Sequence, residues 1–528
     1  DYPDVTDSTA LQAIADVQRA LTQRLPLGRV PMPYQIIGSA FAKLAGYRCI
    51  IGDAPGLGKT IQALSCIAVD PEALLPAVVV APGSVTLKWG LEVSRWLPSV
   101  PVHILREGKT PLPARGWKGI VVVSWTLLAK FADPLVAWGA RFVVGDEIHL
   151  VKSPEAIRTV ALKKLASSIP HAMFLSGTPV LNRVSEFHSP LSALHPDRWG
   201  TFSEFRARYM HGEQKPWGMV WQGLKNAKEL QARLACVMVR RLKTQVAKWL
   251  PDKSRIIAPV DVKPDAMKQY RYIEEKFRQF LSANAAERAE IMAEMFERLG
   301  MPVKDAEKKA KDEADKSVAK TLRAEKLVLV GYLRRELGRM KVAPAVEMAE
   351  TILDAGEPVL LYAEHHDVVR ALATAIGELK VGPDEAHPRI MTITGLDSAE
   401  SKFRKMNEFQ DGKADVVIGT QAIREGMDLF RASNGIFVER WWVPLLEEQA
   451  EDRMHRHGQK NAVTVWYPTV KGTVDERIAA LADEKRGLVD ALLGSEDTKV
   501  EEVSENAQDA LLAALEGRRA VAPVQYRN

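Results

Sequence analysis

A chain of 528 residues exceeds what one hydrophobic core usually supports, so its length predicts at least two domains. Hydrophobic residues make up 46% of the sequence and charged residues 26%, which is typical of an ordinary globular protein. The net charge of +5 permits a polyanionic partner but does not require one.

Composition also disfavours several classes of protein. Cys49, Cys66 and Cys236 lack the spacing of metal ligands and suggest neither a zinc site nor a disulfide framework. No stretch approaches the roughly 18 apolar residues of a membrane span, and the first residues lack the layout of a signal peptide. We therefore expect no membrane partner and an intracellular location, which would be cytoplasmic or nucleoid-associated in a prokaryote or virus and nuclear in a eukaryote.

The segment YRCIIGDAPGLGKTIQALSCIAV, residues 47–69, predicts a strand, a glycine-rich loop and a helix. Gly56 and Gly58 would let backbone N–H groups approach phosphate oxygens, Lys59 would reach the β- and γ-phosphates, and Thr60 would hold Mg²⁺. The strict phosphate-loop pattern requires glycine at position 53, where this chain has Asp53. A glycine turn with an unrelated lysine is the alternative, but the flanking strand and helix favour a phosphate loop.

Four further apolar runs, each followed by turn or polar residues, predict strands at 77–84, 119–125, 141–149 and 171–179. Continuous apolar strands alternating with helices indicate a parallel sheet covered on both faces, with ligands at the carboxyl ends of the strands. There, Asp146 would coordinate Mg²⁺ through water, and Glu147 would orient or deprotonate the attacking water. The alternative is that this acidic pair only caps a helix.

These segments together resemble the Swi/Snf-type ATPases, the double-stranded-DNA translocase branch of helicase superfamily two, over roughly residues 30–480. The segments that carry the resemblance are PYQ (33–35), DAPGLGKT (53–60), VVVAPGSVTLKWGLEVSRWLP (78–98), VVVSWTLL (121–128), DEIH (146–149), LSGTPVLN (175–182) and MVRRLKTQVAKWLPDK (238–253). The resemblance implies an α/β fold of two RecA-like parallel-sheet lobes with helical insertions, ATP and Mg²⁺ as cofactors, and double-stranded DNA as partner. It also places Gln35 on the adenine edge, which an amide can both donate to and accept from.

The second half of the chain predicts another α/β unit without a phosphate loop. A charged, helix-rich stretch at 264–345 precedes strands predicted within 358–369, 389–395, 414–429, 434–442 and 461–470. The expected domains are an N-terminal helical extension (1–29), a first lobe (30–260) with a helical insertion at about 184–250, a helical linker (261–345), a second lobe (346–495) and a C-terminal helix and tail (496–528). That last helix could dock a protein partner or pack on the second lobe.

The run QAEDRMHRHGQK, residues 449–460, would on charge alone be a solvated helix face. However, WVPLLEEQAEDRMHRHGQ (442–459) resembles the family's arginine-containing motif of the second lobe. The resemblance implies that Arg453 and Arg456 reach the γ-phosphate bound to the first lobe, where a guanidinium fork suits phosphate oxygens. It assigns coupling between hydrolysis and movement to Ser176, Thr178, Gly426 and Gln449.

Contacts to the DNA backbone are implied, again by resemblance, for Lys88, Trp89, Ser124, Asn182 and Trp442. Since the chain has 12 tryptophans, packing in the core is the alternative for the two indole rings. The basic residues Arg240, Arg241 and Lys243 could hold phosphates or could form salt bridges between the lobes.

The sequence departs from the family pattern at two places. Ala54 and Pro55 replace a Glu-Met pair, and Ile423, Arg424 and Glu425 replace small residues. We predict an ATP-dependent translocase on duplex DNA whose coupling is affected by the second departure. The alternatives are an annealing or fork-remodelling motor, and a nucleotide-binding recognition subunit of a larger complex that no longer turns over.

Overall fold

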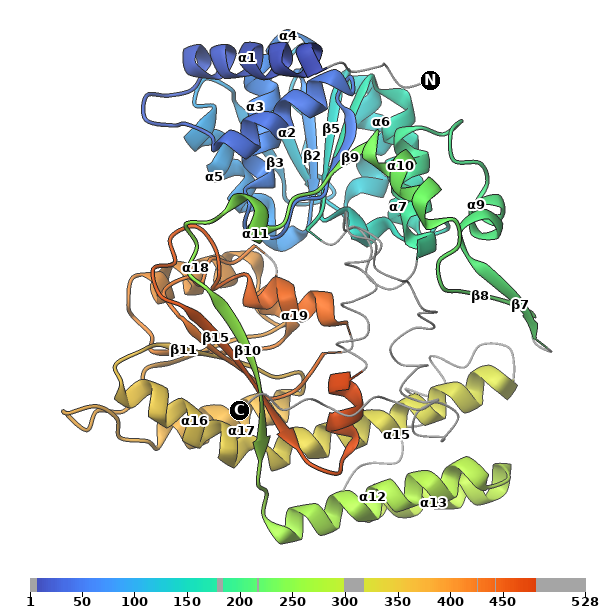
Figure 1. The fold of residues 1–528 in the computed structure, drawn as a ribbon, viewed down its shortest axis with the longest axis vertical. Coiled ribbons are helices and arrows are strands. Elements are labelled where there is room, and N and C mark those ends of the chain that lie inside the picture. Colours follow the sequence, from blue (N-terminus) through green and yellow to red (C-terminus); the bar gives the residue numbers. More distant parts are fainter. Residues whose placement is uncertain are drawn as a thin grey trace.

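Two parallel β-sheets, each the centre of one lobe, form the framework of the computed structural model (Figure 1). The structure describes residues 7–177, 184–215, 218–298, 318–424, 426–441 and 443–480. The first sheet has the strand order β3-β4-β2-β5-β6-β1-β9 and the second the order β10-β15-β14-β11-β13-β12. Every pairing within the two sheets is parallel.

The strands of the first sheet are β1 (Arg48–Ile51), β2 (Ala77–Ala81), β3 (Val102–Leu105), β4 (Ile120–Ser124), β5 (Phe142–Asp146), β6 (His171–Leu175) and β9 (Met238–Val239). The helices around it are α1 (Asp7–Arg24), α2 (Pro33–Leu44), α3 (Lys59–Val69), α4 (Pro71–Leu74), α5 (Thr86–Trp96), α6 (Leu128–Trp138), α7 (Ile157–Ser168), α8 (His188–Leu194), α9 (Phe202–Tyr209) and α10 (Ala227–Ala235). A separate hairpin consists of β7 (His211–Lys215) and β8 (Gly218–Gln222). The short helix α11 (Lys243–Val246) lies between the two sheets (Figure 1).

The first sheet is covered on both faces, because the side chains of its central strands pack alternately into two cores. Along β2, Val78 and Val80 pack in a core with α6 and α7, while Ala77 and Val79 pack in another core with α2, α3 and α5. All five residues of β2 are buried. Side chains alternate between the faces of a strand, so an apolar run of this kind needs cover on both sides.

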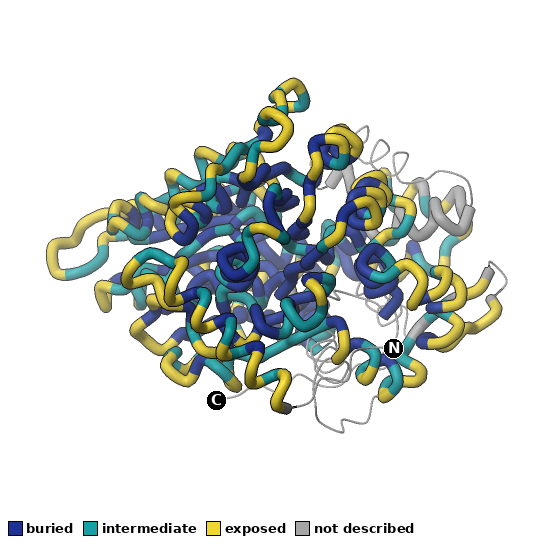
Figure 2. Tube along the Cα trace, turned by 90° about the horizontal axis from the view of Figure 1, so that it is seen from above, coloured by how far each residue is buried: buried dark blue, intermediate teal, exposed yellow. Residues whose placement is uncertain are grey.

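The strands of the second sheet are β10 (Lys253–Val260), β11 (Val359–Tyr362), β12 (Ile390–Ile393), β13 (Val416–Gly419), β14 (Asn434–Phe437) and β15 (Val463–Val470). Its helices are α12 (Pro264–Ser282), α13 (Ala285–Arg298), α15 (Val318–Met340), α16 (Val342–Asp354), α17 (His366–Gly377), α18 (Ala399–Gln410) and α19 (Pro444–Glu451). α16 and α17 contribute to the core on one face of the sheet, and α18 and α19 to the core on the other. α12 and α15 form a further apolar cluster with the end of β15. Figure 2 shows the buried residues in the interior and the exposed ones at the periphery.

The predicted α/β fold of two parallel-sheet lobes is confirmed, with two corrections to the predicted boundaries. The first lobe was expected to end at residue 260, but β10 (Lys253–Val260) pairs with β15 along its whole length and belongs to the second sheet. The insertion at 184–250 was expected to be helical, but it also contains the hairpin β7–β8 and the edge strand β9. Strand pairing is non-local, which is why sequence continuity misplaced β10.

Several predicted features lie outside the described residues. These are Thr178, Asn182, Glu425, Trp442, residues 299–317 of the charged stretch 264–345, and the C-terminal helix and tail at 496–528. In the described part of the chain, no helix has the length and apolarity needed to cross a bilayer.

Candidate nucleotide site

A cavity of about 500 Å³ lies between the lobes and is lined by residues from both of them. The first lobe contributes the glycine loop, the start of α3, part of α5 and the acidic pair that follows β5. The second lobe contributes Gly426, Asp428, Phe430, Arg453, Arg456, His457 and Gly458. This volume is in the range of small-molecule sites, and the predicted phosphate loop and the predicted arginines therefore face one space.

The glycine loop depends on backbone conformations that only glycine adopts readily. Gly56 has a φ of +86° and Gly58 a φ of +73°, and a Cβ at Gly58 would lie 2.3 Å from the side-chain nitrogen of Gln35. Gln35 is buried, and its amide donates to the carbonyl of Leu57 at 3.0 Å and accepts from the backbone N–H of Met32 at 2.9 Å. Gln35 thus borders the cavity and also supports the loop. Lys59 begins α3 and donates to the backbone carbonyl of Asp53 at 2.8 Å.

Asp53, the residue that departs from the strict phosphate-loop pattern, has a structural partner. Its carboxylate is fully buried and receives two bonds from the Arg241 guanidinium, at 2.9 and 2.6 Å, and one from the backbone N–H of Arg241 at 3.0 Å. Gln62 donates to the same carboxylate at 2.8 Å and accepts from Arg241 at 2.9 Å. The prediction left Arg241 open between holding phosphates and forming a salt bridge between the lobes, and the structure shows an ion pair within the first lobe instead.

The acidic pair lies at the carboxyl end of β5, as predicted. The carboxylate of Asp146 accepts from the indole N–H of Trp89 at 2.8 Å and from the backbone N–H of Glu147 at 2.9 Å. Burial, together with the charge of Glu147, raises the pKa of Asp146 to about 6. Glu147 has a φ of +51°, which is uncommon for a residue with a side chain and often marks a functional position.

A polar chain connects this acidic pair to the residue after β6. His149 Nδ1 lies 3.3 Å from a carboxylate oxygen of Glu147 and 3.2 Å from the hydroxyl of Ser176. Both His149 and Ser176 are buried. Ser176, predicted to be a coupling residue, is therefore one side chain removed from Glu147.

The run 449–460 is not a solvated helix face, so that alternative is wrong. α19 ends at Glu451, and Asp452, Arg453, His455 and Gln459 are all at most 9% exposed. Arg453 donates to the backbone carbonyl of Gln449 at 3.1 Å. Both predicted arginines line the cavity, and burial lowers the pKa of Arg453.

Arg456 lies beside the glycine loop, because a Cβ at Gly56 would be 3.1 Å from the Cβ of Arg456. Its guanidinium forms an ion pair with Asp428, and Lys88 of α5 binds the same carboxylate at 2.8 and 2.9 Å. The two flanking cations lower the pKa of Asp428 to about 2, against the opposing effect of burial. Sequence reasoning missed Asp428, which follows Gly426 and Met427 in the predicted coupling region.

Two of the residues predicted to contact DNA, Lys88 and Trp89, line the cavity between the lobes. Trp89 is 2% exposed and its ring bonds to Asp146, which agrees with the alternative that this indole ring packs in the core. Lys88 lies between the lobes, paired with Asp428 and within 3.5 Å of the Gly426 carbonyl. Ser124 is partly exposed at the end of β4.

The remaining coupling residues are Gly426, which lines the cavity with a φ of +68°, and Gln449, which is buried.

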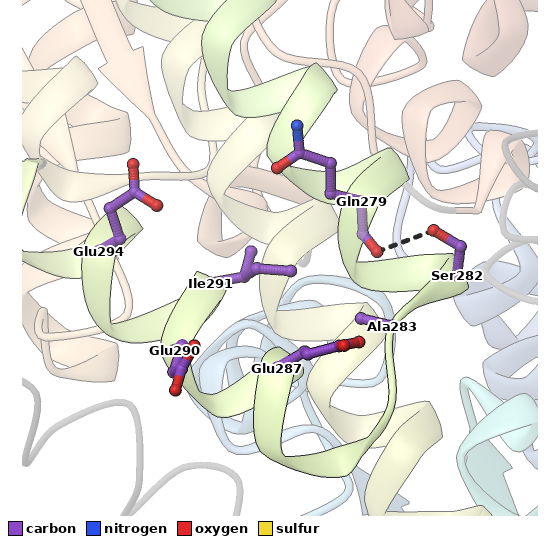
Figure 3. A pocket seen from close by; sticks show the side chains of 7 residues that line it. All are labelled: Gln279, Ser282, Ala283, Glu287, Glu290, Ile291 and Glu294. Carbon is purple, nitrogen blue, oxygen red and sulfur yellow. Dashed lines mark hydrogen bonds between the residues drawn. The ribbon is translucent and has the colours of Figure 1, made fainter.

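A second hollow, of about 360 Å³, lies on α12 and α13 (Figure 3). Its lining residues include three glutamates, Glu287, Glu290 and Glu294, and no lysine or arginine. Carboxylates repel phosphates, so this hollow does not suit a nucleotide or a nucleic-acid backbone.

Comparison with known proteins yields two family matches. The model described as the SNF2-related domain matches residues 38–312, and the helicase conserved C-terminal domain matches residues 345–458. The chain is 31% identical over 478 residues to the Xenopus laevis SWI/SNF-related matrix-associated actin-dependent regulator of chromatin subfamily A-like protein 1, covering 90% of this chain and 45% of that protein. It is 27% identical over 493 residues to the mouse DNA annealing helicase and endonuclease ZRANB3, covering 90% of this chain and 42% of that protein.

The chain thus spans less than half the length of these curated relatives. Among solved structures, the Sulfolobus solfataricus SWI2/SNF2 ATPase core in complex with double-stranded DNA is similar at 21% identity and a TM-score of 0.41, covering 94% of this chain and 98% of that one.

Proposed function

Because the chain belongs to the SNF2-related domain family, we propose that it is an ATPase that couples hydrolysis to movement along double-stranded DNA. One observation carries this proposal: a glycine loop with its lysine, an acidic pair and two arginines from the other lobe line a single cavity. These are the groups that phosphoryl transfer to water requires. A nucleotide-binding subunit without turnover would have no need for Glu147 and both arginines in that cavity.

The residues present fit a magnesium nucleotide. Thr60 and Asp146 offer a hydroxyl and a carboxylate to the same cavity, and Mg²⁺ is usually held by one or two protein oxygens together with substrate phosphates. The metal would neutralise charge on the β- and γ-phosphates. The loop N–H groups and the Lys59 ammonium would hold the same phosphates, and Gln35 would face the base.

Hydrolysis would then use groups of both lobes. Glu147 would accept a proton from water as the water oxygen bonds to the γ-phosphorus. The bond from that phosphorus to the β–γ bridging oxygen breaks, which leaves ADP and inorganic phosphate. Arg453 and Arg456 would stabilise the negative charge of the transition state, and arginines in this role raise the rate by about 10³–10⁵. Because Arg456 is bound to Asp428 in this structure, it would exchange that carboxylate for the γ-phosphate.

Duplex DNA as the track is supported by the family, and an annealing or fork-remodelling activity is favoured by the names of the similar proteins, one of which is called a DNA annealing helicase. Tracking along a backbone is electrostatic, so stimulation by DNA would weaken with salt and show little dependence on base sequence.

An ATPase assay with duplex, forked and single-stranded DNA and with single-stranded RNA tests the proposal. We expect duplex or forked DNA to stimulate turnover more than a single strand, and a larger effect of the fork would favour fork remodelling. Glu147→Gln serves as the control for contaminating ATPases. Equal stimulation by single-stranded RNA, or turnover equal to that of Glu147→Gln with every nucleic acid, would refute the proposal.

A further inference from the structure

The segment Arg241–Lys243, which we call the strap, is where the chain begins to pass from the first lobe to the second. It begins after β9, which pairs with β1 next to the glycine loop, and it leads into β10 of the second sheet. The helix α11, which begins at Lys243, lies between the two lobes (Figure 1). The strap therefore lies beside the nucleotide cavity and is joined covalently to both sides of it.

At its first end the strap holds the start of the glycine loop. Arg241 binds the fully buried carboxylate of Asp53 through its guanidinium and its backbone N–H. The carbonyl of Arg241 accepts from the backbone N–H of Ala54 at 2.9 Å, and the carbonyl of Val239 accepts from that of Gly52 at 2.7 Å. Three consecutive loop residues are thus bonded to the strap and the strand before it, and Lys59 in turn donates to the carbonyl of one of them.

At its second end the strap holds the turn that carries the arginines. The Lys243 ammonium lies 2.7 Å from a carboxylate oxygen of Asp452, and both side chains are nearly buried, at 11% and 7% exposure. Lys243 also donates to the backbone carbonyl of His455. Asp452 and His455 are the residues that immediately precede Arg453 and Arg456, so one lysine contacts the chain just before each arginine.

These two ends cannot move independently. Arg241 and Lys243 are two residues apart, which limits the separation of their Cα atoms to about 7 Å. A Cβ at Gly56 would lie 3.6 Å from the Lys243 nitrogen, so the lysine also borders the loop itself. A shift of the glycine loop therefore moves the arginine turn or breaks a buried ion pair, and an unpaired buried charge is strongly unfavourable.

We propose that Arg241 and Lys243 are positioning residues that couple binding of the nucleotide phosphates at the glycine loop to the placement of Arg453 and Arg456. This inference rests on the proposed ATPase function and concerns residues that do not themselves contact the reacting atoms. Arg241 fixes the loop to the strap, and Lys243 fixes the strap to the arginine turn.

The central test compares turnover with nucleotide affinity in Lys243→Met. We expect kcat to fall about tenfold or more, because small displacements of catalytic groups have effects of this size, while the Kd for a fluorescent ATP analogue changes less than about threefold. The Kd is measured in the Glu147→Gln background to prevent turnover. Lys243→Arg keeps the charge and should retain most of the activity. Lys248→Met, which changes an exposed lysine of the following turn, is the matched control.

The other end should behave differently. Arg241→Lys keeps a positive charge but loses the fork that binds both oxygens of Asp53, so it should raise the nucleotide Kd as well as lower kcat. Only a role in holding the loop predicts this difference between the two ends of the strap. If Arg241→Lys altered kcat alone, the assignment of this residue to the loop would be overturned.

A double variant distinguishes coupling from a general loss of stability. Asp452 also pairs with Lys253, so this cycle is run in a Lys253→Met background. If Lys243 acts through Asp452, adding Asp452→Asn to Lys243→Met in that background should lower kcat no further. Losses that multiply, or a Lys243→Met enzyme as active as Lys248→Met, would overturn the inference. Thermal unfolding of each variant shows whether it is folded, and where Lys243→Met is unfolded, Lys243→Gln takes its place with the same expected loss of kcat. Absence of turnover in the unmodified protein with every DNA would instead count against the proposed function.

Discussion

Replacing Asp53 with glycine would give the loop the strict phosphate-loop pattern, and the structure predicts that this change is harmful. Arg241 has a side chain that is 12% exposed and pairs with a carboxylate that is fully buried, so the substitution leaves a guanidinium without its partner. Removing one partner of a buried pair costs about 3–5 kcal/mol. For a lobe of this size that corresponds to a fall of roughly 6–20 °C in the melting temperature of the first lobe.

Differential scanning calorimetry of Asp53→Gly with and without Arg241→Met provides the assay. The double variant removes both charges, so it should recover part of the stability that the single variant loses. Nucleotide affinity should fall in Asp53→Gly, because the backbone of residue 53 also accepts the bond from Lys59. Asp53→Gly could instead melt at the temperature of the unmodified chain and bind nucleotide at least as tightly. That result would refute the conclusion that Asp53 is needed as the partner of Arg241.

Further predictions concern the chemistry and the closure of the lobes. Glu147→Gln should bind ATP with nearly normal affinity and hydrolyse it at least about 100-fold more slowly, because the group that accepts the proton of water is lost; paired binding and turnover assays check this, and normal hydrolysis would contradict it. Arg456→Ala should lower kcat by about 10³ and change the KM for ATP little, whereas a surface role predicts normal turnover. Burial lowers the pKa of both Lys88 and Lys243 to about 8, so each is charged below that pH and loses its ion pair with Asp428 or Asp452 above it. Turnover should therefore fall as the pH rises from 7 to 9. A double variant, Lys88→Arg with Lys243→Arg, should move this fall to higher pH. If the double variant left the pH profile of turnover unchanged, these lysines would not be the cause of the fall.

The framework of the fold could be predicted because it follows from local pattern. Buried parallel strands such as β2 and β11 are continuous apolar runs, and the glycine loop has a strand before it and a helix after it. β3 and β9 were missed because they are short, partly exposed strands at the edges of the first sheet. β10 combines charged residues with a proline, and only its pairing with β15 shows to which lobe it belongs.

Parts of the candidate site that depend on distant pairs could not be predicted in the same way. The residues proposed for catalysis were chosen from their motifs, but no motif identifies the partner of Asp53, which lies 188 residues away in the chain. Trp89 was expected on a DNA surface by resemblance to a family motif, and nothing in that segment indicates that its indole nitrogen binds Asp146. The sequence did contain one signal for this ion pair. Asp53 stands where the phosphate-loop pattern has glycine, and a carboxylate that becomes buried there requires a cation.

Carboxylates within residues 448–456 are also buried and also require cations, which explains why charged residues gather there. Glu451 is completely buried and binds Lys253 at 2.8 Å and Arg255 at 2.7 Å, and Asp452 binds Lys243 at 2.7 Å and Lys253 at 3.0 Å. Replacing buried ion pairs by apolar residues is often neutral or favourable for stability, so stability alone does not account for this network. Its cations all come from the segment 243–255 that leaves the first lobe and becomes β10. Their geometric effect is to fix the turn that carries Arg453 and Arg456 against a segment of the chain that is also anchored to the glycine loop.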